Sequence, residues 1–188
     1  MITAIVGAGG KTSLIKELTD QHRAEGKRVF VTTTTHMFIE ADTLLTDDAD
    51  TILRALTEIG YAMAGLPAGE KIKALSPETF RAVSNHADVV LVEADGSKGM
   101  PLKFPNATEP VIPEHPDEII VVWGPHGLGR PAREVCHRLE MVLECLGIDG
   151  DTPITRDHVA RLLKKGYLTP LAERYPCAKI VIYPDLPQ

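Results

Sequence analysis

The sequence has few aromatic residues and no long hydrophobic run. Aromatic residues make up only 5% of the 188 residues, which predicts an aliphatic core. No apolar stretch approaches the roughly 18 residues that a membrane span requires. The N-terminus also lacks the basic segment and apolar segment of a secretory signal. We therefore expect no association with a membrane and a cytoplasmic location.

Cysteine and clustered basic charge are also scarce. Of three cysteines, Cys136 and Cys145 are spaced to lie on opposite faces of a helix, and Cys177 stands alone. This pattern argues against a disulfide framework or a structural zinc site. The formal charge of -6 is spread along the chain, and no block of Lys and Arg is interleaved with aromatic residues. Nucleic acid is thus not an expected partner, since a polyanion needs a basic face.

Short apolar runs alternate with helical patterns along the chain. The apolar runs, which lack the alternation of a half-exposed sheet, are "ITAIV" (2–6), "RVFVT" (28–32), "DVVLVE" (88–93), "EIIVVWG" (118–124) and "KIVIY" (179–183). Helical patterns cover residues 11–26, 48–60 and 76–86. Together they predict an α/β fold, a mainly parallel sheet with helices on both faces as in P-loop NTPases.

Two segments depart from this alternation. Residues 61–76 contain two short runs around "GLPAGE", which predicts a β-hairpin attached to the edge of the sheet. Residues 131–147 and 155–167 predict two consecutive helices, the second capped by Thr155, as a C-terminal helical segment before the last strand. No repeat or linker appears, so we expect residues 1–188 to form a single nucleotide-binding domain.

The stretch "GAGGKTS" follows the first predicted strand and opens the first predicted helix. Backbone N–H groups of such a turn and the helix N-terminus point at one concavity, which suits phosphate. Lys11 would neutralise phosphate oxygens, and the Thr12 hydroxyl would bind magnesium. The spacing is the short form G-x-x-G-K-T. The alternative is a structural turn whose lysine faces water, but the position after the first strand favours a phosphate loop formed by Gly7, Ala8, Gly9, Gly10, Lys11, Thr12 and Ser13.

Polar residues follow two other predicted strands at the same carboxyl edge, where ligands bind in open α/β folds. In "VVLVEADGS", Glu93 and Asp95 are candidate magnesium ligands that would also orient an attacking oxygen, and Gly96 would donate its N–H to the terminal phosphate. In "TTTTHM", the hydroxyls of Thr33, Thr34 and Thr35 would face magnesium or phosphate. The alternatives are a polar turn and a strand extended by threonine propensity.

A proline-rich segment, residues 93–116, follows the third long apolar run. A rigid polar loop at the carboxyl end of a strand is where function often lies. Lys98 and Lys103 are candidates for binding phosphate or an acidic substrate, or they are solvated surface lysines.

Four pieces resemble the YqeC-like family: "GAGGKTSL", "VTTTTHM", "VEADGSKGMPLKFPNATEPVIP" and "WGPHGLGRPAREVCHRLE". The resemblance implies a P-loop-type nucleotide-binding protein that serves a selenium-dependent molybdenum hydroxylase or its cofactor. It also implies site roles for the phosphate loop, for residues 33–35, and for Glu93, Asp95, Lys103 and Glu109, with Arg138 reaching the ligand from the helical segment. An Asn-Lys-x-Asp element is missing, so the base is left open.

Three functions are compatible with these motifs. The first is a magnesium-dependent protein that binds ATP or GTP and hydrolyses it during enzyme maturation, with Lys11, Glu93 and Asp95 as the catalytic groups. The second is an ATP-dependent ligase or small-molecule kinase. The third is a non-catalytic cofactor carrier or a chaperone that docks on a partner.

Overall fold

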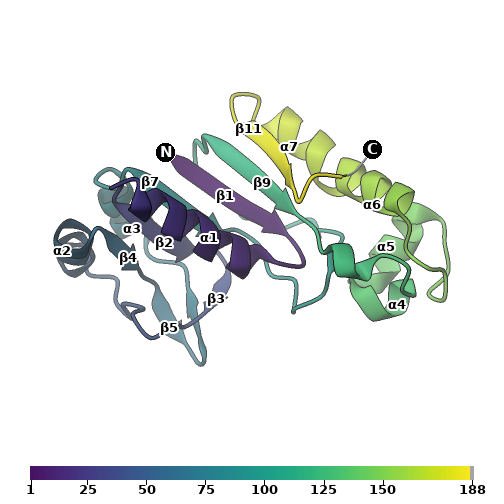
Figure 1. The fold of residues 1–188 in the computed structure, drawn as a ribbon, viewed down its shortest axis with the longest axis horizontal. Helices are drawn as coiled ribbons and strands as arrows, with labels where there is room; N and C mark the ends of the chain where they lie inside the picture. The colour runs from purple at the N-terminus through teal and green to yellow at the C-terminus, as the bar shows by residue number, and fades with distance from the viewer. Residues whose placement is uncertain (187–188) are drawn as a thin grey trace.

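A six-stranded parallel sheet forms the centre of the computed structural model, which describes residues 1–186 (Figure 1). The strand order is β11 (Lys179–Tyr183), β9 (Glu118–Val122), β1 (Ile2–Gly7), β7 (Val89–Glu93), β2 (Val29–Thr33) and β4 (Tyr61–Met63). All neighbouring pairs are parallel. The five predicted strands are confirmed. Strands β7, β2 and β4 lie on one side of β1, and β9 and β11 lie on the other. In such folds, ligands bind at the carboxyl end of the strand where the order reverses, which here is β1.

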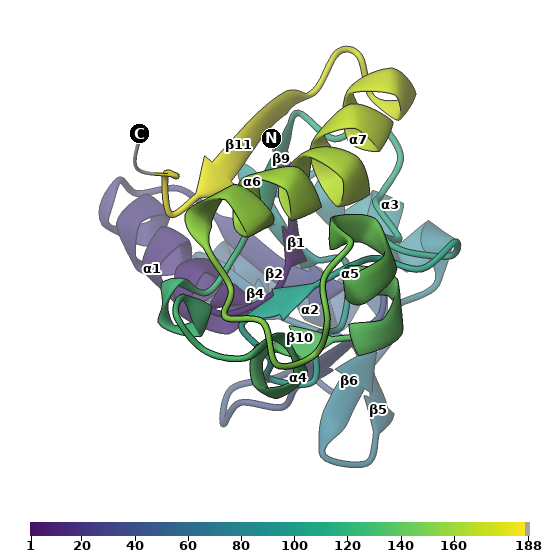
Figure 2. The ribbon, with the colours of Figure 1, turned by 90° about the vertical axis from the view of Figure 1, so that its right-hand side faces the viewer.

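Helices cover both faces of the sheet, as the uninterrupted apolar runs predict. α1 (Lys11–Ala24) packs Leu14 and Ile15 on one face, against side chains such as Ile5. α2 (Ala49–Ile59) and α3 (Pro77–Ser84) cover the opposite face at β2, β4 and β7. The C-terminal helices cover that same face at β1 and β9. Figure 2 shows these C-terminal helices in front of the sheet.

The predicted hairpin of residues 61–76 is placed differently in the structure. Its first run forms β4, the edge strand of the main sheet, which pairs with β2. The hairpin proper consists of β5 (Leu66–Ala68) and β6 (Lys71–Lys73), and it joins β3 (His36–Phe38) in a separate three-stranded sheet of order β3-β6-β5. The expectation that the hairpin extends the main sheet was therefore wrong. A three-residue run does not specify its partner strand. The antiparallel partner of β6 is β3, which lies far away in sequence.

The predicted helix of residues 131–147 is interrupted. α4 (Ala132–Val135) ends where β10 (Cys136–His137) pairs with β8 (Leu102–Lys103), and α5 (Leu139–Leu146) begins after Arg138, whose φ is 59°. Pairing with β8 outweighs helical propensity here. The second predicted helix is α6 (Arg156–Leu163), with the Thr155 cap confirmed by a hydrogen bond from the His158 N–H. It continues through a π-helical turn, η2 (Lys164–Leu168), into α7 (Thr169–Arg174). A 3₁₀ turn, η1 (Pro125–Gly127), follows β9.

Candidate functional site

The glycine turn between β1 and α1 is held tightly against the end of β9. Gly7, Gly9 and Gly10 have φ values of 92°, 77° and 133°, which side chains rarely allow. A Cβ on Gly7 would lie 2.1 Å from the Val122 carbonyl oxygen, and one on Gly9 would lie 2.6 Å from the Pro101 carbonyl oxygen. The Ala8 N–H donates to that same Val122 oxygen at 2.9 Å. Glycine is therefore required for the path of the loop itself.

The N-terminus of α1 opens beside this turn. Gly10 is the N-cap residue, it is exposed, and no side chain of the described residues caps the helix there. A Cβ on Gly10 would find only one atom within 4 Å, at 3.9 Å. The first N–H groups of a helix have no partner within the helix and attract anions. The first backbone N–H groups of α1 are thus available as hydrogen-bond donors to a ligand beside Gly10.

Lys11, the first residue of α1, does not face open solvent. Its side chain is only 4% exposed, and its Nζ donates to the Gly7 carbonyl oxygen at 2.8 Å. The same ammonium lies 3.3 Å from Asp95 Oδ1 and 3.8 Å from Glu93 Oε1. The alternative of a lysine that simply faces water is therefore wrong for this loop, because the ammonium lies over the turn between two carboxylates.

Asp95 lies behind the loop rather than in front of it. Its side chain is fully buried, and its Oδ2 accepts hydrogen bonds from the Gly7 N–H and the Tyr167 hydroxyl, both at 3.1 Å. The Lys103 ammonium is 3.2 Å from the same oxygen. Asp95, expected to bind magnesium or orient an oxygen, contacts the loop instead, and its position suits a group that fixes the loop.

Glu93, at the end of β7, is the acidic residue that faces the site. It is 8% exposed and lines the cavity described below. Burial raises its pKa to about 7, the nearby Lys11 ammonium opposes the rise, and the Asp95 carboxylate adds to it. A carboxyl group that titrates near neutral pH can both accept and donate a proton there.

Lys103, Glu109 and Arg138 form a cluster of ion pairs beside Asp95. Lys103 is fully buried and donates to the Gly96 carbonyl oxygen at 2.6 Å and to Glu109 Oε2 at 2.5 Å. Arg138 Nη1 donates to the same Glu109 oxygen at 2.5 Å. Burial opposes ionisation of Glu109, but the hydrogen bonds from Arg138 and Lys103 outweigh it and lower its pKa to about 2. Lys103 and Arg138, both expected to reach a ligand, are engaged by protein groups.

Of the threonines at positions 33–35, one reaches the surface of the site. The Thr33 hydroxyl donates to the Glu93 carbonyl oxygen at 2.8 Å and accepts from the Thr35 N–H at 3.0 Å. The Thr34 hydroxyl donates to the Val111 carbonyl oxygen. Of the three expected threonines, Thr35 lines the cavity, and the other two connect β2 to β7 and to the proline-rich segment.

A cavity of about 700 Å³ lies in front of the glycine turn. Small-molecule sites are commonly clefts of this size. The sequence-predicted residues that line it are Gly9, Gly10, Lys11, Thr12, Ser13, Thr35, Glu93, Gly96, Lys98 and Glu109. Sequence reasoning missed Met37, Phe38, Lys71, Ser97 and Gly99, which also line it. Phe38 and Lys71 reach the cavity because β3 pairs with β6, and no local sequence pattern predicts that pairing.

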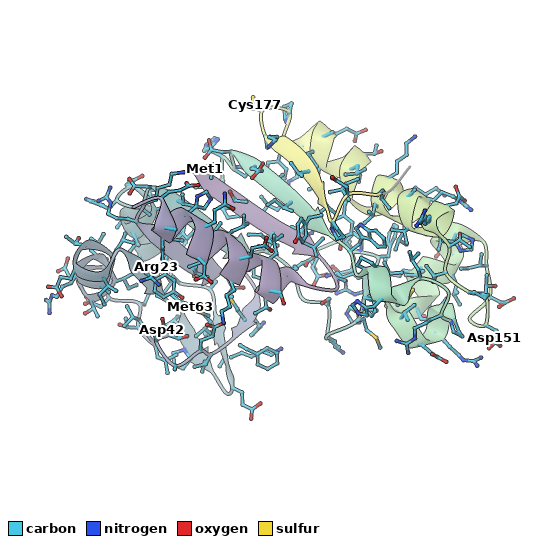
Figure 3. The ribbon with its side chains drawn as sticks, in the orientation of Figure 1. Met1, Arg23, Asp42, Met63, Asp151 and Cys177 are labelled. Atoms are coloured by element: carbon cyan, nitrogen blue, oxygen red, sulfur yellow. The ribbon has the colours of Figure 1, made fainter. Side chains whose placement is uncertain are left out.

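A smaller cavity of about 140 Å³ adjoins the first along α1, and it shares Thr12 and Met37 with it. Its lining includes Arg23, Asp42 and Met63, which are labelled in Figure 3. The Arg23 guanidinium lies 5.0 Å from the centre of the Tyr61 ring, which holds this helix end against β4.

Residues 1–186 offer neither a cluster of metal-binding side chains nor a helix that could span a membrane. Residues 1–186 contain no group of three or more His, Cys, Asp or Glu side chains arranged to hold a metal ion. Among the helices of that same range, none has the length and apolar character that crossing a membrane demands.

The sheet and the site define an α/β protein with a glycine turn at the carboxyl end of its first strand, consistent with a P-loop NTPase-like fold. The chain belongs to the YqeC protein family, whose model matches residues 3–140. A similar relative is the "Uncharacterized protein YqeC" of Escherichia coli (strain K12), 36% identical over 172 residues, which cover 87% of this chain and 67% of the relative. No solved structure matches the chain. The expected family is thus confirmed.

Proposed function

We propose that the chain binds a nucleoside triphosphate, ATP or GTP, together with magnesium, and hydrolyses it or transfers its phosphate. One observation carries the proposal. The Lys11 ammonium lies 2.8 Å from the Gly7 carbonyl oxygen, over a turn whose uncapped helix N-terminus opens into a cavity of about 700 Å³. A cation and free backbone donors at one end of a cleft of this size are what a polyphosphate requires.

The residues present suit a magnesium–phosphate group. Gly9 and Gly10 line the cavity without side chains, so phosphate oxygens can approach the backbone. The Thr12 hydroxyl and the Glu93 carboxylate line the same cavity and are oxygen ligands of the kind magnesium prefers. The pKa of Glu93 is raised mainly by burial, which a divalent cation would counteract. When bound, magnesium would neutralise phosphate charge.

The chain's own residues would supply positioning and charge. Lys11 and the first N–H groups of α1 would stabilise charge that develops on the transferred phosphoryl group. Glu93, which lines the cavity, would orient the attacking oxygen. Asp95 would act indirectly, because it holds the Gly7 N–H and the Lys11 ammonium in place.

Calorimetric titration tests this function. ATP, GTP and their non-hydrolysable analogues are titrated with and without magnesium into the wild type, Lys11→Ala and Lys164→Ala. Lys164 is an exposed lysine in the C-terminal helices and serves as the matched control. We expect magnesium-dependent binding that Lys11→Ala abolishes and Lys164→Ala preserves. Absence of binding to the wild type would exclude the nucleotide function, and circular dichroism shows whether each variant is folded.

Turnover assays separate the remaining possibilities. A hydrolase would release phosphate from the bound nucleotide alone, whereas a ligase or small-molecule kinase would need an acceptor. A carrier or docking chaperone would bind without turnover. The family resemblance suggests the partner, a selenium- or molybdenum-dependent hydroxylase or its cofactor. Co-purification of this chain with such a hydroxylase, with and without nucleotide, tests that accessory role.

A further inference from the structure

Part of the wall of the large cavity is built by β3 and β6 of the three-stranded sheet. Phe38 on β3 lies directly opposite Lys71 on β6, and both line the cavity together with His36. β3 lies near the N-terminal end of α1 (Figure 1). Met37, between His36 and Phe38 on β3, is buried in the core and also borders the cavity. The exposed face of this small sheet is therefore part of the site.

Phe38 is positioned as no core aromatic would be. Phe38 is 58% exposed, and it is one of only four phenylalanines in the chain. The Lys71 ammonium lies 4.5 Å from the centre of the Phe38 ring, which fixes the ring at the cavity wall. An exposed ring that lines a concave site is a surface on which another planar ring can stack.

The same cavity is lined by two further lysines, Lys71 and Lys98. In residues 1–186 the ion pairs beside the cavity involve Lys11, Lys103 and Arg138, and none involves Lys71 or Lys98. Lys98 also has a φ of 51°, a costly backbone conformation for a residue with a side chain. Such strain is typical of segments held in place for binding.

We propose that the wall formed by Phe38, Lys71 and Lys98 binds a second small molecule that carries both a planar ring and an anionic group. The ring would stack on Phe38, and the anionic group would pair with the two lysines. The concave shape and the volume of about 700 Å³ fit a small molecule rather than a macromolecular surface. The proposal deepens the proposed function, since it gives the chemical class of the molecule beside the nucleotide.

Three defined probes test the proposal by ligand-detected NMR titration. 2-Naphthoate has a planar ring and a carboxylate, 2-naphthamide keeps the ring without the charge, and cyclohexanecarboxylate keeps the charge without the ring. We expect 2-naphthoate to bind more tightly than either of the others. Equal binding of all three probes, or no binding, would overturn the proposal.

Variants locate the binding. Phe38→Leu removes the ring, and Lys71→Gln removes the charge. Each is expected to weaken 2-naphthoate binding about 3- to 10-fold, which is the effect of one stacking or cation contact. Lys73→Gln is the matched control, because Lys73 lies on the same strand and does not line the cavity. Equal effects of Lys71→Gln and Lys73→Gln would overturn the proposal.

A competition with ADP separates this proposal from the proposed function. If ADP and 2-naphthoate bind together, both hold. If 2-naphthoate binds and ADP does not, the wall is a binding site and the nucleotide function fails. Displacement of 2-naphthoate by ADP would assign Phe38 to the base of the nucleotide itself, and the second ligand would be excluded.

Discussion

At the scale of single residues, Glu93 makes stability depend on pH in an unusual direction. Its pKa of about 7 in the folded chain exceeds the ordinary 4.5, mainly because of burial. The folded state therefore binds more protons than the unfolded state between these values, and stability falls as pH rises through this window. The loss is on the order of 3 kcal/mol between pH 4.5 and pH 7.

The variant Glu93→Gln isolates this contribution. Denaturant unfolding of both proteins is measured at pH 5 and pH 8. We expect the wild type to lose about 3 kcal/mol relative to Glu93→Gln over this range, because glutamine has no proton to release. A difference between the two proteins that is the same at both pH values would mean that Glu93 keeps an ordinary pKa.

Tyr167 supports Asp95, and through it the glycine turn. Its hydroxyl donates to Asp95 Oδ2 at 3.1 Å, and burial together with that carboxylate raises the pKa of Tyr167 well above its usual range. Tyr167→Phe removes a donor from a buried charge, so we expect a loss of about 2 kcal/mol in the free energy of unfolding. The matched control is Tyr183→Phe, because the Tyr183 hydroxyl donates a hydrogen bond to Glu17 at the surface. Equal losses in the two variants would contradict a supporting role for Tyr167.

At the scale of elements, the glycine turn makes a sharp steric prediction. Gly7 and Gly26 both have positive φ values, but only at Gly7 would a Cβ meet another atom, the Val122 carbonyl oxygen at 2.1 Å. Gly26→Ala is expected to cost about 1 kcal/mol from its backbone conformation alone. Gly7→Ala should cost several kcal/mol more, since the loop must leave β9. Urea unfolding curves of both variants test this, and similar midpoints would show that the loop shifts freely.

The elements that the sequence predicted correctly carry their signals locally. β1, β2 and β7 are apolar runs, and the helix that starts at Pro77 has Ser76 as an N-cap that accepts from the Thr79 N–H. The errors concern pairing over distance. β3 pairs with β6 across about 35 residues, and β8 pairs with β10 across a similar span and breaks a predicted helix. Segments of two or three residues carry too little pattern to specify such partners.

At the scale of the whole molecule, topology explains which site residues were predictable. Lys11 and Glu93 follow strands that are neighbours in a parallel sheet, so their meeting follows from the fold class. The roles of Lys103 and Arg138 do not follow, because both depend on how the proline-rich segment packs against the C-terminal helices. Their partners, Asp95 and Glu109, became visible only in three dimensions.

Arg138 connects the C-terminal helices to the segment that borders the cavity. Its pair with Glu109 has side chains only 21% and 16% exposed, and Glu109 also holds Lys103. Arg138→Gln leaves Glu109 with one cation, so we expect residues 97–109 to exchange amide hydrogens faster, while β1 keeps its protection. Hydrogen exchange measured by mass spectrometry resolves these segments.

The control for Arg138 is Arg130→Gln, because Arg130 pairs with Glu134 on the exposed surface at 3.2 Å. Exposed pairs contribute little to stability, so this variant should leave exchange in residues 97–109 unchanged. If Arg138→Gln also left that exchange unchanged, the segment would be held by Lys103 alone. Faster exchange in β1 as well would mean that Arg138 stabilises the whole fold rather than the border of the cavity. The expected pattern, confined to residues 97–109, would establish that the C-terminal helices hold one wall of the site.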